Sequence, residues 1–194
     1  PGFSAPVEQA QTSFKALLMA NSYPGRIGMI DLGIKSPGDM APALYALALS
    51  LFDTDTSLWI EPNWEAANEG ALSKPIKFHC NCPLVTETLA ADMAVAKSDD
   101  LPDLARAFNL GTDEYPDRSA TLFIQVPALE GGLKTRWTGP GIKDQIFATI
   151  AGLDADFWDQ RNLACSAFPL GLDIVFCCGD HILALPRSTK VEEM

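Results

Sequence analysis

The sequence has little histidine and little positive charge, and both shortages limit what the chain can do. Only 2 of the 194 residues are histidine, and 14 lysine and arginine residues stand against 25 aspartate and glutamate residues, a net charge of −11. General binding to nucleic acid or to an anionic membrane requires a positive electrostatic field, so we expect neither partner. A phosphate ligand stays possible, because one helix N-terminus or one glycine turn can bind an anion locally.

Long apolar runs, an export signal and an even number of cysteines are also missing. The longest apolar stretch, residues 40–52, is shorter than the roughly 20 residues that span a membrane. The start PGFSAPVEQAQ has no basic segment followed by an apolar core, so we expect no export signal. The 5 cysteines are therefore predicted to be reduced thiols of a cytoplasmic protein rather than a disulfide framework.

Hydrophobic periodicity and turn residues predict interleaved helices and strands. Helices are expected over 6–21, 40–52, 63–73, 101–108 and 155–163, and strands over 26–32, 57–60, 92–96, 120–126, 133–138, 172–178 and 182–185. Residues 133–138 are expected to pair back on 120–126, and Gly179-Asp180 to turn a hairpin. This mixture predicts one α/β domain over residues 1–194, a three-layer α/β/α arrangement with a mixed sheet covered by helices on both faces.

The helix predicted over 40–52 is apolar on nearly every side. Asp39 is a suitable N-cap, and Pro42 lies in the first turn, where proline is tolerated. A helix without a polar face is buried on several sides. We therefore expect it at the centre of a dimer or of a layered fold.

Histidines and cysteines fall in two clusters that could bind a metal or simply pack. His79, Cys80 and Cys82 lie in FHCNCP, and Cys177, Cys178 and His181 lie in VFCCGDH. Structural zinc usually takes its ligands in pairs from turns that let both side chains point inward. Cys177 and Cys178 lie inside a predicted strand, where neighbouring side chains point to opposite faces. The spacing favours packing, and no metal site is predicted.

Three further groups of residues have a structural and a functional interpretation. The stretch TGPGIK, residues 138–143, is rich in glycine but lacks the spacing of a phosphate-binding loop, so a tight turn is favoured. Asp53 and Asp55 could be paired carboxylates, although alternating Asp and Thr after a helix is ordinary turn chemistry. Asp173 opens an apolar strand and needs a partner if buried, for which Arg187 is chemically suitable. No catalytic residue can be named from these patterns.

Several segments, taken in order, resemble the PhnH family, whose members belong to the carbon–phosphorus lyase complex of phosphonate metabolism. The closing stretch FPLGLDIVFCCGDHILALPRSTKVE resembles the C-terminal signature of that family. VEQAQTSFKALLMANSYPG, LSLFDTDTSLWI, FHCNCPLV and TRWTGPGI resemble its other motifs. The resemblance extends from about residue 7 to residue 193, and its specificity comes from the combination of motifs rather than from any one of them.

The resemblance implies a role in the catabolism of organophosphonates. Proteins of this family join other subunits in a cytoplasmic carbon–phosphorus lyase core complex, which supports formation of ribose 1-alkylphosphonate 5-triphosphate from ATP and alkylphosphonate. The resemblance further implies a homodimer, a fold similar to the large domain of PLP-dependent transferases but without PLP, and no cofactor in this subunit. ATP or alkylphosphonate is a possible ligand.

The family motifs also imply a set of residues around a ligand cleft. They are Asp53, Asp55, Thr56, His79, Thr138, Gly139, Gly141, Asp173 and Arg187. The resemblance gives none of them a catalytic role, and for His79 the interpretation as a structural histidine is slightly favoured. Two hypotheses follow: a homodimeric scaffold or co-catalytic subunit of the complex, and a stand-alone transferase acting on phosphorylated ribose compounds in its own cleft.

Overall fold

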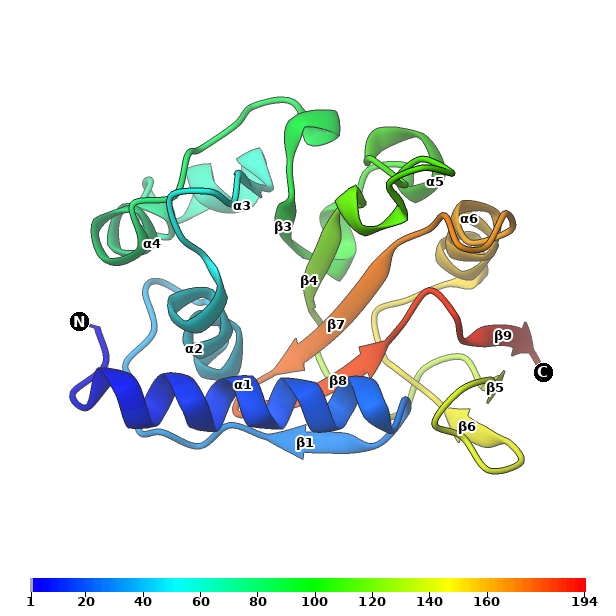
Figure 1. The fold of residues 1–194 in the computed structure, drawn as a ribbon. Helices are drawn as coiled ribbons and strands as arrows, with labels where there is room; N and C mark the ends of the chain where they lie inside the picture. The colour runs from blue at the N-terminus through cyan, green and yellow to red at the C-terminus, as the bar shows by residue number, and fades with distance from the viewer. Residues whose placement is uncertain (1) are drawn as a thin grey trace.

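The computed structural model describes residues 2–194 and contains a large and a small β-sheet (Figure 1). The large sheet has the spatial order β1-β8-β7-β4-β3-β2. Its strands are β1 (Ile27–Met29), β2 (Leu58–Ile60), β3 (Met93–Lys97), β4 (Thr121–Gln125), β7 (Asp173–Cys178) and β8 (His181–Leu185). Strands β2, β3, β4 and β7 are parallel, whereas β8 and β1 are antiparallel to their neighbours. The predicted mixed sheet is confirmed.

Helices lie on both faces of the large sheet. They are α1 (Pro6–Ser22), α2 (Pro42–Leu51), α3 (Pro62–Ala67), α4 (Ser73–Cys80), α5 (Leu104–Ala107) and α6 (Ala155–Ala164), with short 3₁₀ turns at Thr88–Ala90, Ser98–Asp100 and Pro116–Arg118. Side chains alternate between the faces along each strand. In β7, Val175 and Cys177 join the cluster around α2, whereas Ile174 and Phe176 join the cluster around α6.

Helix α2 is buried on all sides within this one chain. Every residue from Ala43 to Ala48 is at most 1% exposed, and α2 shares its cluster with residues of α1, α4 and the sheet. This burial satisfies the layered-fold alternative without a second copy. The helix begins after Ala41 rather than after Asp39, so the expected N-cap role of Asp39 is wrong. The Asp39 carboxylate instead accepts hydrogen bonds from Trp64 and Asn68.

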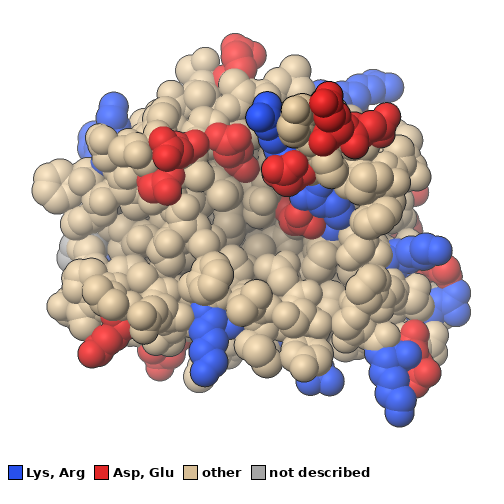
Figure 2. All heavy atoms as spheres, in the orientation of Figure 1, with Lys and Arg blue, Asp and Glu red and all other residues tan. Residues whose placement is uncertain are grey.

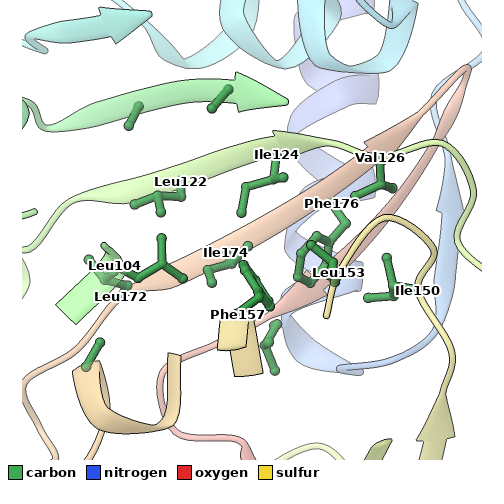
Figure 3. Close-up of a cluster of buried hydrophobic side chains, with 14 of the residues drawn as sticks. Leu104, Leu122, Ile124, Val126, Ile150, Leu153, Phe157, Leu172, Ile174 and Phe176 are labelled. Atoms are coloured by element: carbon green, nitrogen blue, oxygen red, sulfur yellow. The ribbon is translucent and has the colours of Figure 1, made fainter. Parts of the chain in front are cut away.

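The opposite face of the sheet is covered by α5, α6 and the segment that leads into α6. Figure 3 shows Leu122, Ile124, Ile174 and Phe176 of the sheet directed toward Phe157 of α6. The Phe157 ring lies edge-on to the Trp158 ring, and their centroids are 5.0 Å apart. It also lies edge-on to the Phe176 ring, at a centroid distance of 6.0 Å. This apolar layer fixes α6 against the strands.

The small sheet corrects the predicted partner of residues 133–138. Strand β5 (Thr135–Thr138) pairs with β6 (Ile146–Ala148) and with β9 (Lys190–Glu193), not with 120–126. The physical reason is that β4 already has β3 and β7 on its two edges. Neither β6 nor β9 was expected, because β6 has only three residues and β9 is mostly charged.

Two predicted helices are shorter or divided. Residues 63–73 do not form one helix, because Glu69 and Gly70 adopt left-handed φ angles of 54° and 72° and separate α3 from α4. The helix expected over 101–108 is reduced to the four residues of α5. The hairpin through Gly179-Asp180 is confirmed by the antiparallel pairing of β7 with β8.

Charge is unevenly distributed over the surface. Figure 2 shows charged side chains gathered in the upper right of the view, over the region of α5, whereas the face crossed by α1 is mostly uncharged. Apolar side chains stand exposed on that face, among them Val7, Phe14 and Leu18 of α1 and Met29 of β1. Within residues 2–194, none of the helices combines the length and apolar character that crossing a membrane requires.

Candidate functional site

An ion pair between Asp173 and Arg187 ties together the edge of the large sheet at which the parallel strands begin. Asp173 is the first residue of β7, and Arg187 follows the end of β8. The Asp173 carboxylate accepts a hydrogen bond of 2.8 Å from the Arg187 backbone amide and one of 3.0 Å from its Nε. Arg187 also donates to the carbonyl of Pro116 at 2.6 Å. The predicted pairing is confirmed, and it leaves Arg187 few donors for a ligand.

A cavity of about 580 Å³ opens beside this ion pair, between α6 and the segment that leads into β9. Its polar lining includes Arg161, Asn162, Ser166, Arg187, Thr189 and Lys190. Three of these six side chains are cations. A carboxylate, Glu192, lines it as well, but that side chain forms an ion pair with Arg136. The cavity is therefore a basic site on a strongly acidic protein.

Arg161 is a buried cation without a carboxylate partner. It is 1% exposed and forms no salt bridge with any carboxylate of residues 2–194. Its Nη2 donates to the Pro186 carbonyl at 2.9 Å and its Nη1 contacts Asn162 Oδ1 at 3.4 Å, while its Nε has no partner. Burial lowers the pKa of Arg161, against the opposing influence of Cys165 and Asp173. A buried charge left unpaired is costly, so this arrangement needs an explanation.

Unpaired polar atoms concentrate in this part of the molecule. Within residues 2–194, five buried side-chain atoms lack a hydrogen-bond partner: Ser119 Oγ, Arg136 Nε, Trp158 Nε1, Arg161 Nε and Thr189 Oγ1. Four of the five belong to α6, β5 or the residue before β9. Arg161 and Thr189 both line the cavity. Buried polar atoms without partners commonly mark the place of an ion, a water molecule or a ligand.

The glycine-rich turn after β5 borders the same cavity. Thr138 is paired in register with Lys190, and Pro140 lines the cavity. Gly139 has a φ of 140°, and a Cβ atom there would lie 3.0 Å from the Ser188 carbonyl oxygen. Gly141 serves a different contact, since a Cβ atom there would lie 2.2 Å from the carbonyl oxygen of Ser22 in α1. The turn interpretation is confirmed, and its glycines permit close packing of the backbone.

The other predicted cleft residues lie elsewhere. Asp53 and Thr56 precede β2, which is three strands away from β7, or about 14 Å at the usual strand spacing. The Asp53 carboxylate accepts hydrogen bonds from the Asp55 amide at 2.9 Å and from the Thr56 hydroxyl at 3.2 Å. These contacts confirm the turn interpretation. His79 is exposed on α4, beside the Phe78 ring. The structure therefore does not bring all nine residues into one cleft.

The thiols pack rather than cluster around a common point. Cys177 is fully buried against the α2 side of the sheet, whereas Cys178 packs toward the α6 side. Burial raises the pKa of the Cys80 thiol to about 12, with Cys82 and Asp53 acting in the same direction. In residues 2–194 no group of three or more His, Cys, Asp or Glu side chains is arranged to hold a metal ion.

At the opposite edge, where the parallel strands end, polar groups satisfy one another. Asp39 accepts hydrogen bonds from Trp64 Nε1 at 2.6 Å and Asn68 Nδ2 at 2.9 Å, and it forms an ion pair with Lys97. Gln125 accepts the Ala41 amide at 2.7 Å and donates to the Asp39 carbonyl at 2.9 Å. This network joins the ends of β3 and β4 to the start of α2.

A second cavity, of about 590 Å³, lies where Asp154 caps the N-terminus of α6. Its lining includes Asp99, Asp154 and Asp156 and no lysine or arginine. The negative charge of this lining repels anions. Of the two large cavities, only the basic one suits an anionic ligand.

Arg161 and Thr189 were not singled out from the sequence, although both carried a signal. Arg161 follows Phe157 and Trp158 at spacings of four and three residues, so it shares their buried face of α6. A cation on a buried, apolar helix face is unusual and indicates a candidate functional residue. Thr189 lies inside the PRSTKVE motif, where Arg187 drew attention as the charged residue.

Comparison with known proteins assigns the chain to a family. A family model described as bacterial phosphonate metabolism protein (PhnH) matches residues 1–192. The chain belongs to the PhnH family. This confirms the resemblance found in the sequence motifs.

Two relatives of this PhnH-family chain have descriptive names. A Rhizobium meliloti (strain 1021) protein named alpha-D-ribose 1-methylphosphonate 5-triphosphate synthase subunit PhnH is 38% identical over 192 residues. The alignment covers 98% of this chain and 94% of that relative. A Stutzerimonas stutzeri protein named putative C-P lyase subunit protein HtxG is 29% identical over 181 residues, which cover 93% of this chain and 85% of the relative.

Proposed function

We propose that this chain is a subunit of a carbon–phosphorus lyase complex that degrades organophosphonates. In that role it supports formation of ribose 1-alkylphosphonate 5-triphosphate from ATP and alkylphosphonate. The observation that carries the proposal is the 38% identity, over nearly the full length of both chains, to a protein named as a subunit of the corresponding synthase. The second relative, named as a C-P lyase subunit, supports the same assignment.

Within the complex, the chain acts as a scaffold or co-catalytic subunit and binds no cofactor of its own. Asp173 and Arg187, the charged pair most suited to chemistry, are bonded to each other, which supports a structural use of both. We place the complex in the cytoplasm and the fold close to the large domain of PLP-dependent transferases without PLP. The parallel strands flanked by antiparallel β8 are compatible with that likeness.

Adenine release separates this role from that of a stand-alone transferase. The purified chain is mixed with ATP and methylphosphonate, first alone and then with the subunits encoded beside it. The scaffold role predicts no adenine release from the chain alone and release in the reconstituted mixture. Adenine release by the chain alone would instead establish the stand-alone transferase, and failure of a tagged chain to retain its neighbours during purification would count against the complex.

We also propose that the chain forms a homodimer through the exposed apolar face of α1 and β1. Val7, Phe14 and Leu18 recur along one stripe of α1 and are 71%, 53% and 53% exposed. Apolar patches of this kind commonly mark interfaces between proteins. β1 also lies at the end of the large sheet, with a neighbouring strand on only one side.

Light scattering at micromolar concentration measures the oligomeric state directly. The wild-type chain should scatter as a dimer, and Phe14→Asp should scatter as a monomer, because an unpaired charge in an apolar interface is costly. Thr12→Asp, also exposed on α1, is the matched control and should remain dimeric. A monomeric wild-type chain would refute the homodimer without touching the assignment to the complex.

A further inference from the structure

We infer that the basic cavity between α6 and the segment leading into β9 binds a phosphate or phosphonate group, with Arg161 and Thr189 as its deepest ligands. This binding concerns the chain alone and does not require its place in a complex. Three observations support it: an unpaired buried cation, unpaired buried donors, and a cavity of ligand size at the same place.

The charge of Arg161 calls for an anion. Its guanidinium contacts only a backbone carbonyl and an amide oxygen, so no negative charge balances it directly. Asp173, the carboxylate beside the cavity, is already bonded to Arg187. Lys190 adds positive charge to the lining, Asp173 balances the charge of Arg187, and the neighbouring Glu192 is paired with Arg136. An anion entering the cavity would therefore meet two cations, Arg161 and Lys190, that form no ion pair with a carboxylate of residues 2–194.

The available hydrogen-bond donors indicate a tetrahedral oxyanion. Arg161 Nε and Thr189 Oγ1 both lack partners, and each residue is 1% exposed. The hydroxyl of Ser188 and the ammonium group of Lys190 line the more accessible part of the cavity. Donors on several sides match the three terminal oxygens of a phosphate or phosphonate better than the two of a carboxylate.

The size of the cavity indicates that the anion is attached to a larger group. A volume of about 580 Å³ lies within the range of small-molecule sites, roughly 300–1,000 Å³, and exceeds what a free phosphate ion fills. Phe168 and Cys165 contribute an apolar wall beside the cationic one. An organic phosphate or phosphonate fits this division, with its charged group against Arg161.

Calorimetric titration of the full chain tests this binding. Inorganic phosphate, methylphosphonate and ribose 5-phosphate serve as probes, with acetate and sodium chloride at matched ionic strength as controls. We expect saturable binding of the phosphorus oxyanions and none of acetate. Tighter binding of ribose 5-phosphate would identify a sugar phosphate as the source of the group, and tighter binding of methylphosphonate would identify a free phosphonate.

Two variants assign the binding to this cavity. Arg161→Met should weaken binding at least about tenfold, since hydrogen bonds to charged groups are the strong ones. Thr189→Val keeps the shape of the side chain, removes Oγ1 and should weaken binding about threefold to tenfold. Arg106→Gln is the matched control, because Arg106 is an 84% exposed arginine of α5 outside this cavity, and it should bind as wild type.

The titrations remain decisive if one variant is unstable. If Arg161→Met fails to fold, as judged by circular dichroism, Arg161→Lys and Thr189→Val still report on the same cavity. The inference is overturned if none of the three phosphorus oxyanions binds at millimolar concentration. It is also overturned if the Arg161 and Thr189 variants bind as tightly as wild type, or if Arg106→Gln loses as much affinity as they do.

Discussion

The two ends of the parallel strands use polar side chains in opposite ways. At the carboxyl ends, Asp39 is bonded to Trp64, Asn68 and Lys97, and Gln125 completes a closed network. At the amino ends, Asp173 and Arg187 satisfy each other, but Arg161 and Thr189, beside them, keep buried donors without partners. At the carboxyl ends these polar groups are paired, so we call this the saturated end. At the amino ends some buried donors have no partner, so we call this the incomplete end.

This difference reverses the usual arrangement of open α/β sheets. Ligands in such folds generally bind at the carboxyl ends of the strands. Here the polar groups of β3, β4, α3 and the approach to α2 bond to one another at that end, and the cavity between the ends of β3 and β4 is small, about 200 Å³. The incomplete end carries the basic cavity instead. Likeness of fold alone would therefore point to the wrong edge, and the hydrogen bonds of individual side chains have to decide.

The largest effect on stability is expected from breaking the ion pair at the amino ends. Asp173→Ala removes the acceptor of three hydrogen bonds from Arg187 and leaves a largely buried guanidinium without its counter-charge. We expect a loss of about 2–3 kcal/mol in the free energy of unfolding, less than for a fully buried pair because both side chains are partly exposed. Urea denaturation measures it, and Asp173→Asn should lose less because Oδ1 remains.

A loss below about 0.5 kcal/mol for Asp173→Ala, within the range of ordinary surface changes, would contradict the structural role of the pair. The Asp173 and Arg187 side chains would then become free to serve a ligand. That result would move the candidate site from Arg161 toward the ion pair itself.

The next effect comes from opening the saturated end. Gln125→Met keeps the length of the side chain but leaves the Ala41 amide and the Asp39 carbonyl without their partners. We expect a loss of about 1–2 kcal/mol in the free energy of unfolding, because partly buried backbone groups are left unsatisfied.

Phosphate affinity of the same variant sharpens the contrast. Gln125→Met should bind phosphate as wild type does, whereas Thr189→Val should lose affinity with a smaller loss of stability. The comparison between the two ends fails if Gln125→Met weakens phosphate binding as strongly as Thr189→Val, as measured by the same titration.

Much of the fold was predictable because its helices and strands depend on patterns within short segments of the sequence. The spacing of Val7, Phe14 and Leu17 predicted α1 within one residue of its observed end, and the branched residues of 120–126 predicted β4. The apolar character of α2 correctly predicted its burial. What failed was pairing between distant segments: whether 133–138 joins 120–126 depends on which strands already flank β4, and no local pattern contains that information.

The site was only partly predictable for a related reason. The pair Asp173–Arg187 could be expected because an acid that opens an apolar strand needs a cation. Arg161 was missed because its significance lies in a missing partner, which only the full set of neighbours reveals. Asp53, Asp55, His79 and Asp173 all lie in family motifs. Those motifs belong to different helices and strands, and membership of a motif does not fix the distance between them.

A smaller effect is expected from the exposed part of the saturated end. Lys97→Met removes the cation bonded to Asp39, whose side chain is 51% exposed. Exposed ion pairs contribute roughly 0.2–1 kcal/mol, so we expect a loss of about 0.5 kcal/mol in low salt and less in high salt. Urea denaturation at two salt concentrations measures it. A loss independent of salt would mean that the contact of the Lys97 ammonium group with the Trp64 ring, rather than its ion pair with Asp39, stabilises this end.

The smallest expected effect is the acid dependence that Asp39 gives to stability. Burial raises the pKa of Asp39, but hydrogen bonds from Lys97, Trp64 and Asn68 outweigh it and hold the pKa below its usual range. A carboxyl with a lowered folded pKa stabilises the protein above its unfolded pKa, and this contribution is lost as the pH falls through the folded value.

Asp39→Asn should therefore flatten the fall in unfolding free energy between neutral pH and about pH 3. The change should stay below about 0.5 kcal/mol, because Asp39 is half exposed and water screens its partners. Lys97→Met should flatten the same part of the profile, since it removes one of the groups that lower the pKa of Asp39. Urea midpoints measured across this pH range test both variants. If the unfolding free energy of Asp39→Asn fell more steeply with acid than that of the wild type, the Asp39 carboxylate would destabilise the fold. The contrast between the two ends of the strands would then be weaker.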